Sequence, residues 1–110
     1  MAKRHLKVLL IEDNPGDVRL IQEMLTEAKD TVFHLTSANS LAEGLMQLRR
    51  AKFEIILLDL LLSDSQGLET FHAMQRKAPE VPIIVLSGFD DEALAMGVGL
   101  QEGDDGLRLR

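Results

Sequence analysis

FEIILLDLLLSDSQGLET, residues 53–70, is the stretch that decides how this chain folds. Every residue from Phe53 to Leu62 is apolar except Glu54 and Asp59, a pattern typical of a strand that is buried on both faces of a sheet. A carboxylate near the end of such a run is costly to bury unless a partner or a cation offsets its charge. Asp59 is therefore a candidate site residue, and the neighbouring strands should show what accompanies it.

Short apolar runs and amphipathic patterns alternate along the rest of the chain. We predict strands over residues 6–11, 31–38, 53–60 and 81–86. Asn14 followed by Pro15 predicts one helix start, Ser40 predicts a second, and Pro79 ends a third helix. The first helix should turn one apolar face inward, made of Val18, Ile21, Met24, Leu25 and Ala28. Apolar strands joined by single helices predict a doubly wound, flavodoxin-like α/β fold with a parallel sheet in the order 2-1-3-4-5.

The last twenty residues depart from this pattern. A fourth helix should begin within the acidic segment 90–92, but Gly97 and Gly99 interrupt it at about 1 kcal/mol each relative to alanine. Leu107 and Leu109 predict only a short fifth strand, and the fifth helix of such a fold is missing from the sequence. We therefore expect one domain over residues 1–110 that is C-terminally truncated or atypical.

The composition excludes several classes of function. A net charge of −6 argues against nucleic-acid binding, which needs a basic patch. With no cysteine, the chain has no disulfide, thiolate metal site or cysteine nucleophile. The apolar runs are far shorter than the roughly 20 residues that span a bilayer, and the N-terminus lacks the pattern of a signal peptide. We expect a cytoplasmic domain with no membrane partner.

Ligands of open parallel α/β sheets bind where the carboxyl ends of the strands meet. Glu12 and Asp13 end the first strand, Asp59 ends the third, and Ser87 and Gly88 end the fourth. Strands one and three are neighbours in this order, so three carboxylates should share one crevice and raise one another's pKa values. A divalent cation would relieve this repulsion, and oxygen ligands favour Mg²⁺. Such a carboxylate can also accept a phosphoryl group, beside the Ser87 hydroxyl and the small Gly88.

At these residues the chain resembles the receiver domains of two-component response regulators. The matching segments are VLLIEDNPGDVRLIQEML (8–25), IILLDLLLSDSQGLETF (55–71) and VPIIVLSGFDDEALAM (81–96). The resemblance implies a signalling phosphoacceptor that is not otherwise an enzyme. Its phosphodonor would be a sensor histidine kinase or a phosphotransfer protein, and its output would pass to an output domain or a homodimer.

The resemblance also implies a role for each site residue. Asp59 would be the phosphoacceptor, Asp13 a direct Mg²⁺ ligand and Glu12 a ligand through water, while the Leu61 backbone carbonyl would complete the protein's share of the metal shell. Ser87 would be the switch hydroxyl, with Gly88 beside it. Leu61 and Phe89 occupy the positions that tune the lifetime of the phosphoryl group, and neither can orient an attacking water.

The chain departs from the family's pattern at several positions. Ser63 replaces a common proline, and Leu107 stands at an aromatic switch position. Arg110, or Arg108 if the alignment shifts, replaces a lysine that contacts the phosphoryl group, and a planar guanidinium does not reproduce a compact ammonium. The alternative function is therefore a pseudo-receiver, a protein-interaction or dimerisation module that works without phosphorylation. Pseudo-receivers normally lose one of the three acids, and this chain keeps all of them.

Overall fold

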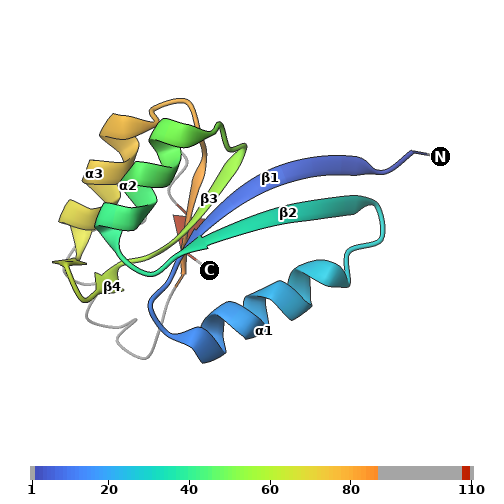
Figure 1. Cartoon of the computed structure of the whole chain (residues 1–110), viewed down its shortest axis with the longest axis horizontal. Coiled ribbons are helices and arrows are strands. Elements are labelled where there is room, and N and C mark those ends of the chain that lie inside the picture. Colours follow the sequence, from blue (N-terminus) through green and yellow to red (C-terminus); the bar gives the residue numbers. More distant parts are fainter. Residues whose placement is uncertain (1, 87–107, 110) are drawn as a thin grey trace.

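The computed structural model describes residues 2–86 and the backbone of residues 108–109. Figure 1 shows the elements in chain order. They are β1 (Arg4–Ile11), α1 (Pro15–Thr26), β2 (Thr31–Ala38), α2 (Leu41–Arg50), β3 (Ile55–Asp59), β4 (Leu61–Leu62), β5 (Ser65–Gln66), α3 (Leu68–Lys77), β6 (Ile83–Leu86) and β7 (Arg108–Leu109).

The main sheet has the order β2-β1-β3-β6-β7, and every neighbouring pair is parallel. Because β6 and β7 are the fourth and fifth strands of the predicted fold, the predicted order 2-1-3-4-5 is confirmed. The fifth strand is short, as expected, with two residues. The fourth helix was predicted within residues 87–107, which lie outside the described residues, as does everything after Leu109.

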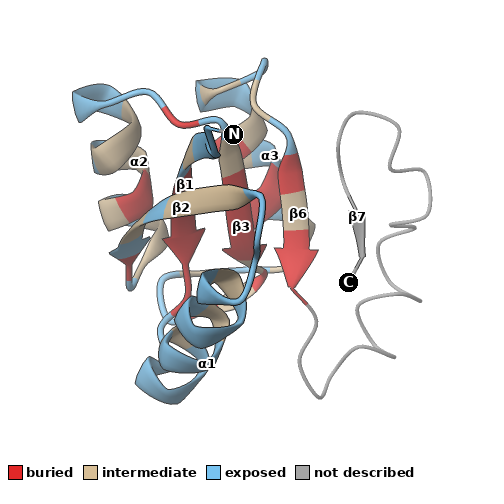
Figure 2. Ribbon diagram, turned by 90° about the vertical axis from the view of Figure 1, so that its right-hand side faces the viewer, coloured by how far each residue is buried: buried red, intermediate tan, exposed pale blue. Residues whose placement is uncertain are grey.

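Helices cover the sheet on both faces, and Figure 2 shows α1 apart from α2 and α3. Side chains alternate along β1, so that Leu9 and Ile11 pack in one core cluster while Val8 and Leu10 pack in another. The first cluster includes residues of α2 and α3, and the second includes Val18, Ile21 and Leu25 of α1. The central strands are therefore buried on both sides, as their continuous apolar sequences predict.

The predicted start of α1 is confirmed, but two residues of its predicted inward face, Met24 and Ala28, do not lie on it. The Asn14 side chain accepts hydrogen bonds from the N–H groups of Gly16 (2.8 Å) and Asp17 (3.1 Å), and Pro15 is the first helical residue. The side chain of Met24 is 57% exposed, and Ala28 is exposed and follows the end of the helix at Thr26. A turn of 100° per residue places Met24 at the margin of the stripe that Ile21 and Leu25 form.

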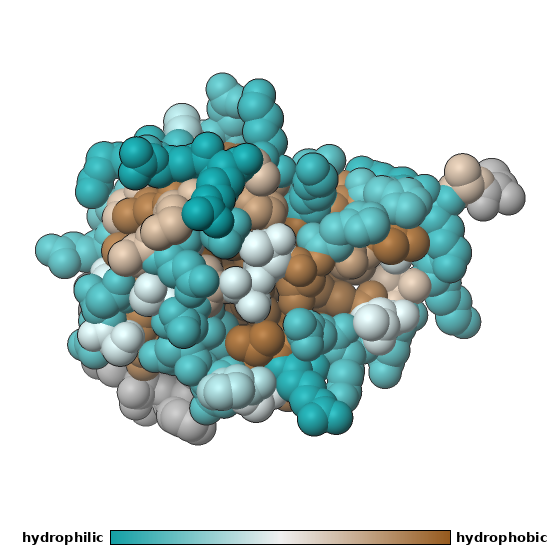
Figure 3. Space-filling view, in the orientation of Figure 1, coloured by the Kyte–Doolittle hydropathy of each residue, from teal (hydrophilic) through white to brown (hydrophobic). Residues whose placement is uncertain are grey.

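A groove of about 440 Å³ lies between α1 and β2. Its lining is mostly apolar and includes Leu25, Phe33 and Leu35. Hydrophobic residues are visible between these two elements in the space-filling view of Figure 3. Because the groove lies toward the amino end of β2, it is separate from the predicted site at the carboxyl ends of the strands. Within residues 2–86, no helix is long and apolar enough to cross a membrane.

Candidate functional site

Three carboxylates meet at the carboxyl ends of β1 and β3. Ile11 pairs with Leu58 in the parallel ladder, so the residues that follow them, Glu12 and Asp59, lie on adjacent strands. One carboxylate oxygen from each of Glu12, Asp13 and Asp59 lies within 4.8 Å of the others. Glu12 is buried, Asp59 is partly buried and Asp13 is exposed. The structure thus brings together the three acids that the sequence placed at strand ends.

Burial raises the pKa of two of these acids. Burial, together with the charge and hydrogen bond of Asp59, raises the pKa of Glu12 to about 7, and the N–H of Asn14 opposes this shift. Burial also raises the pKa of Asp59, against the effect of the Leu61 N–H, which donates to Oδ1 at 3.0 Å. Both carboxyl groups therefore hold a proton, or attract a cation, more readily than exposed carboxylates do.

The donor set fits a hard divalent cation. All three groups offer carboxylate oxygens, which suit Mg²⁺ better than softer metals. In the described part of the chain, none of the three acids forms an ion pair with a lysine or arginine, and the one ion pair found there joins Arg19 to Glu23. A cation would therefore offset a negative charge that no described basic side chain neutralises.

A short hairpin follows Asp59 and was not predicted. Strands β4 and β5 are antiparallel, with Leu61 opposite Gln66 and Leu62 opposite Ser65. Leu62 is buried in the core cluster under α2 and α3, whereas Leu61 is only partly buried. The two strands of two residues each are too short for an apolar alternation to reveal, although Ser-Asp at positions 63 and 64 is a common turn pair.

The hairpin leads into α3 through a glycine. Gly67 has a φ of 77°, a conformation that glycine adopts without a steric penalty. Its N–H donates to the Leu60 carbonyl at 2.7 Å, which closes the hairpin. Ser65 Oγ lies 2.6 Å from Oγ1 of the fully buried Thr70 and ties β5 to α3.

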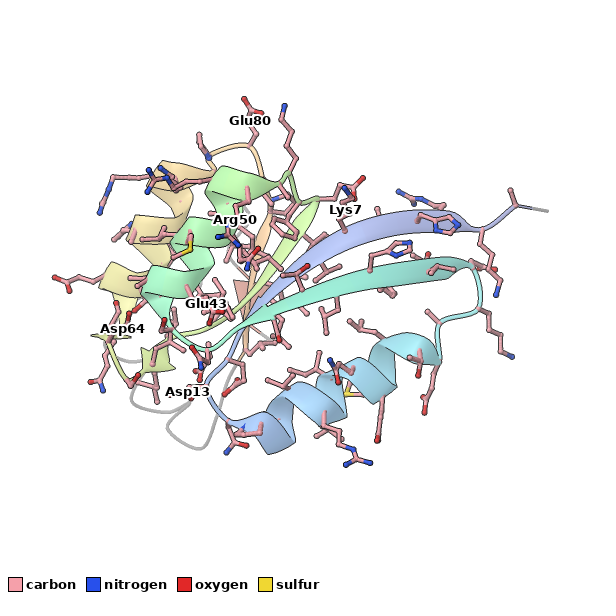
Figure 4. All side chains as sticks on the ribbon, in the orientation of Figure 1. Lys7, Asp13, Glu43, Arg50, Asp64 and Glu80 are labelled. Atoms are coloured by element: carbon pink, nitrogen blue, oxygen red, sulfur yellow. The ribbon has the colours of Figure 1, made fainter. Side chains whose placement is uncertain are left out.

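Asp64, at the tip of the hairpin, has a role that the sequence did not reveal. Its carboxylate accepts hydrogen bonds from the N–H groups of Leu41 (2.9 Å) and Ala42 (3.0 Å) in the first turn of α2. These two N–H groups lower the pKa of Asp64. Asp64 and its partners are more than 20 residues apart, so no local pattern could have identified the contact. Figure 4 shows Asp64, Asp13 and Glu43 toward the same end of the sheet.

Several predicted site residues lie outside the described residues. They are Ser87, Gly88, Phe89 and Arg110. Arg108 is described only in its backbone, which pairs with Ile84. The roles predicted for these residues in contacting the phosphoryl group stay predictions.

Comparisons with known proteins identify the family. A family model described as "Response regulator receiver domain" matches residues 8–107. The transcriptional regulatory protein GlrR of Escherichia coli K12 is 31% identical over 87 residues, which are 79% of this chain and 19% of GlrR. The chain belongs to the response regulator receiver domain family, and the predicted membership is confirmed. This family serves two-component signalling and is not a typical enzyme family.

Solved structures agree with this assignment. A sensor protein from Polaromonas sp. JS666 matches with a TM-score of 0.77 and 25% identity over 96% of this chain and 82% of that one. The phosphorylated cyanobacterial phytochrome response regulator RcpA matches with a TM-score of 0.72 and 26% identity over 96% of this chain and 78% of that one. The fold and the family are thus supported by sequence and structure together.

Proposed function

We propose that this domain accepts a phosphoryl group on Asp59 from the phosphohistidine of a sensor histidine kinase or phosphotransfer protein, and that Mg²⁺ assists the transfer. The observation that carries this proposal is the approach of Glu12, Asp13 and Asp59 to within 4.8 Å. The similarity to RcpA, whose solved structure is that of the phosphorylated protein, adds support because it extends over 96% of this chain.

Each residue of the site has its own role in this proposal. Asp13, Asp59 and the Leu61 carbonyl would bind the metal directly, and Glu12 would bind it through water. Bound Mg²⁺ would neutralise negative charge on the carboxylates and on the phosphoryl oxygens. The Leu61 N–H, which donates to Asp59 Oδ1, holds the carboxylate in one orientation. These contributions are positioning and electrostatics, which suit a transfer that needs little further chemistry from the protein.

The transfer itself is a balanced displacement. A carboxylate oxygen of Asp59 forms a bond to phosphorus as the bond from phosphorus to the donor's histidine nitrogen breaks. That nitrogen keeps the electron pair and takes up a proton. Phosphorylation would then shift Ser87 and the segment around it, and so alter a surface that binds an output domain or a second copy of the chain.

A small phosphodonor tests the proposal without the unknown kinase. Wild-type protein incubated with phosphoramidate and Mg²⁺ should gain the mass of one phosphoryl group, and Asp59→Asn should gain none. Asp30→Asn is the matched control, since Asp30 is exposed and lies at the amino end of β2. It should be phosphorylated like the wild type, and EDTA should prevent the gain in both. A wild type that gains no phosphate would favour the pseudo-receiver instead.

A further inference from the structure

The start of α2 is capped from two directions. Three N–H groups of its first turn have side-chain acceptors, and only one of these acceptors is local: Ser40 Oγ accepts from Glu43 at 3.1 Å. The other two N–H groups, of Leu41 and Ala42, donate to the two carboxylate oxygens of Asp64. The tip of the β4–β5 hairpin is thus joined to α2 by two charge-assisted hydrogen bonds.

The segment just before α2 also binds the backbone of Glu12, one of the three acids of the site. Glu12 donates its backbone N–H to the carbonyl of Ala38 at 2.9 Å, and Ala38 ends β2 just before α2. Glu43 Oε1 accepts a hydrogen bond from the N–H of Asn39 at 2.9 Å, which fixes the turn between β2 and α2. Residues on either side of the site, Glu12 and the hairpin after Asp59, are therefore both bound to the segment from Ala38 to Ala42.

The hairpin needs such an anchor. Each of its strands has two residues, and a hairpin of this size is not stable by itself in water. Leu62 is buried in the core cluster, and Leu61 packs against the same cluster but is only partly buried. Asp64 restrains the tip, beyond the reach of the Leu62 packing.

We propose that Asp64 is a positioning residue that holds the β4–β5 hairpin against the start of α2 and thereby fixes the Leu61 carbonyl at the metal site. This inference rests on the proposed function only for the role of Leu61. The anchoring of the hairpin by Asp64 stands on the two hydrogen bonds alone.

Asp64→Ala and Ser40→Ala separate positioning from helix capping. Each variant removes side-chain acceptors from the first turn of α2, and each should lower the melting temperature. Only Asp64→Ala releases the hairpin. Asp64→Asn is a milder variant, because its amide oxygen can still accept one of the two N–H groups.

Two measurements on the whole chain decide whether Asp64 anchors the hairpin or only caps α2. Hydrogen exchange of the Gly67 amide, which closes the hairpin, should be about tenfold faster in Asp64→Ala and unchanged in Ser40→Ala. The Kd for Mg²⁺, measured by calorimetry because the chain has no Trp or Tyr, should rise about tenfold in Asp64→Ala and less in Asp64→Asn. Ser40→Ala should bind Mg²⁺ like the wild type.

Equal exchange and equal Mg²⁺ affinity in Asp64→Ala and Ser40→Ala would overturn the inference and leave Asp64 as a helix cap. A wild type that binds no Mg²⁺ would instead refute the metal site of the proposed function. The exchange of Gly67 would then still decide whether Asp64 anchors the hairpin.

Discussion

Glu12 is a carboxyl group that the fold buries beside a second carboxyl group. Its exposed fraction is 6%, and its pKa is raised to about 7 from an ordinary value of 4.5. Between these values the folded chain binds the proton more tightly than the unfolded chain does, so the free energy of unfolding falls as the pH rises. The burial of Glu12 therefore costs stability at neutral pH when no metal is present.

This cost predicts that the stability of the metal-free protein depends on pH. In EDTA, the melting temperature of the wild type minus that of Glu12→Gln should decrease by several degrees from about pH 5 to about pH 8. Glutamine cannot ionise, so the difference isolates the titration of residue 12 from that of other groups. A difference that stays constant over this range would show that Glu12 is not buried as described.

Leu61 bears on the lifetime of the phosphoryl group. Its side chain, like that of Phe89, cannot orient a water for attack on the aspartyl phosphate, so loss of phosphate should be slow. We expect a half-life of minutes or longer in Mg²⁺ buffer, and a shorter one for Leu61→Asn, whose amide can hold a water. A wild-type half-life of seconds would contradict this expectation.

Gly44 controls the approach of helix α2 to strand β1. A Cβ atom at this position would lie 2.5 Å from Cδ1 of Ile11, the residue before Glu12. Gly44→Ala should therefore lower the free energy of unfolding by about 1–3 kcal/mol, although alanine favours a helix more than glycine does.

A double variant checks the physical reason for this loss. Ile11→Val removes the Cδ1 methyl group and alone should cost about 0.5–1.5 kcal/mol. Combined with Gly44→Ala it should cost less than the sum of the two single losses, because Cδ1, the nearest clashing atom, is gone and only Cγ1, at 3.0 Å, stays close. Strictly additive losses, measured by denaturant unfolding, would show that the close contact with Ile11 is not the cause.

The elements that could be predicted from the sequence are those with local signals. Asn14 and Pro15 mark the start of α1, and the apolar run ending at Asp59 marks β3. The β4–β5 hairpin was missed because strands of two residues are too short for an apolar alternation to reveal. The cap that Asp64 provides was missed because it joins segments more than 20 residues apart. Met24 was misplaced because it lies at the margin of a helical stripe, where spacing alone does not decide exposure.

In the whole molecule, the acids and the hairpin lie at the carboxyl edge of the sheet, and helices cover both faces. This arrangement explains why the three acids could be predicted together: parallel strands bring their ends to one edge whatever the loops do. The roles predicted for Ser87 and Arg110, which lie outside the described residues, stay predictions.

Metal binding at this edge should stabilise the whole fold. A ligand that binds only the folded chain adds about 2.7 kcal/mol when its concentration is about a hundredfold above its Kd. Saturating Mg²⁺ should therefore raise the melting temperature of the wild type and of Asp30→Asn, but not that of Asp13→Asn. Without metal, Asp13→Asn should be at least as stable as the wild type, because it removes one of three repelling charges.

A rise in the melting temperature of Asp13→Asn equal to that of the wild type would place the metal elsewhere. Ca²⁺, which binds similar oxygen ligands with less demanding geometry, provides a comparison for the selectivity of the site.

Chemical mapping of the phosphorylated residue tests the central claim most directly. Protein treated with phosphoramidate and Mg²⁺ is reduced with borohydride, which converts an aspartyl phosphate to homoserine, and its peptides are analysed by mass spectrometry. Homoserine should occur at position 59 only, and only in the sample that contained Mg²⁺. Homoserine at another position such as Asp13, or at none, would contradict the assignment of Asp59 as the phosphoacceptor.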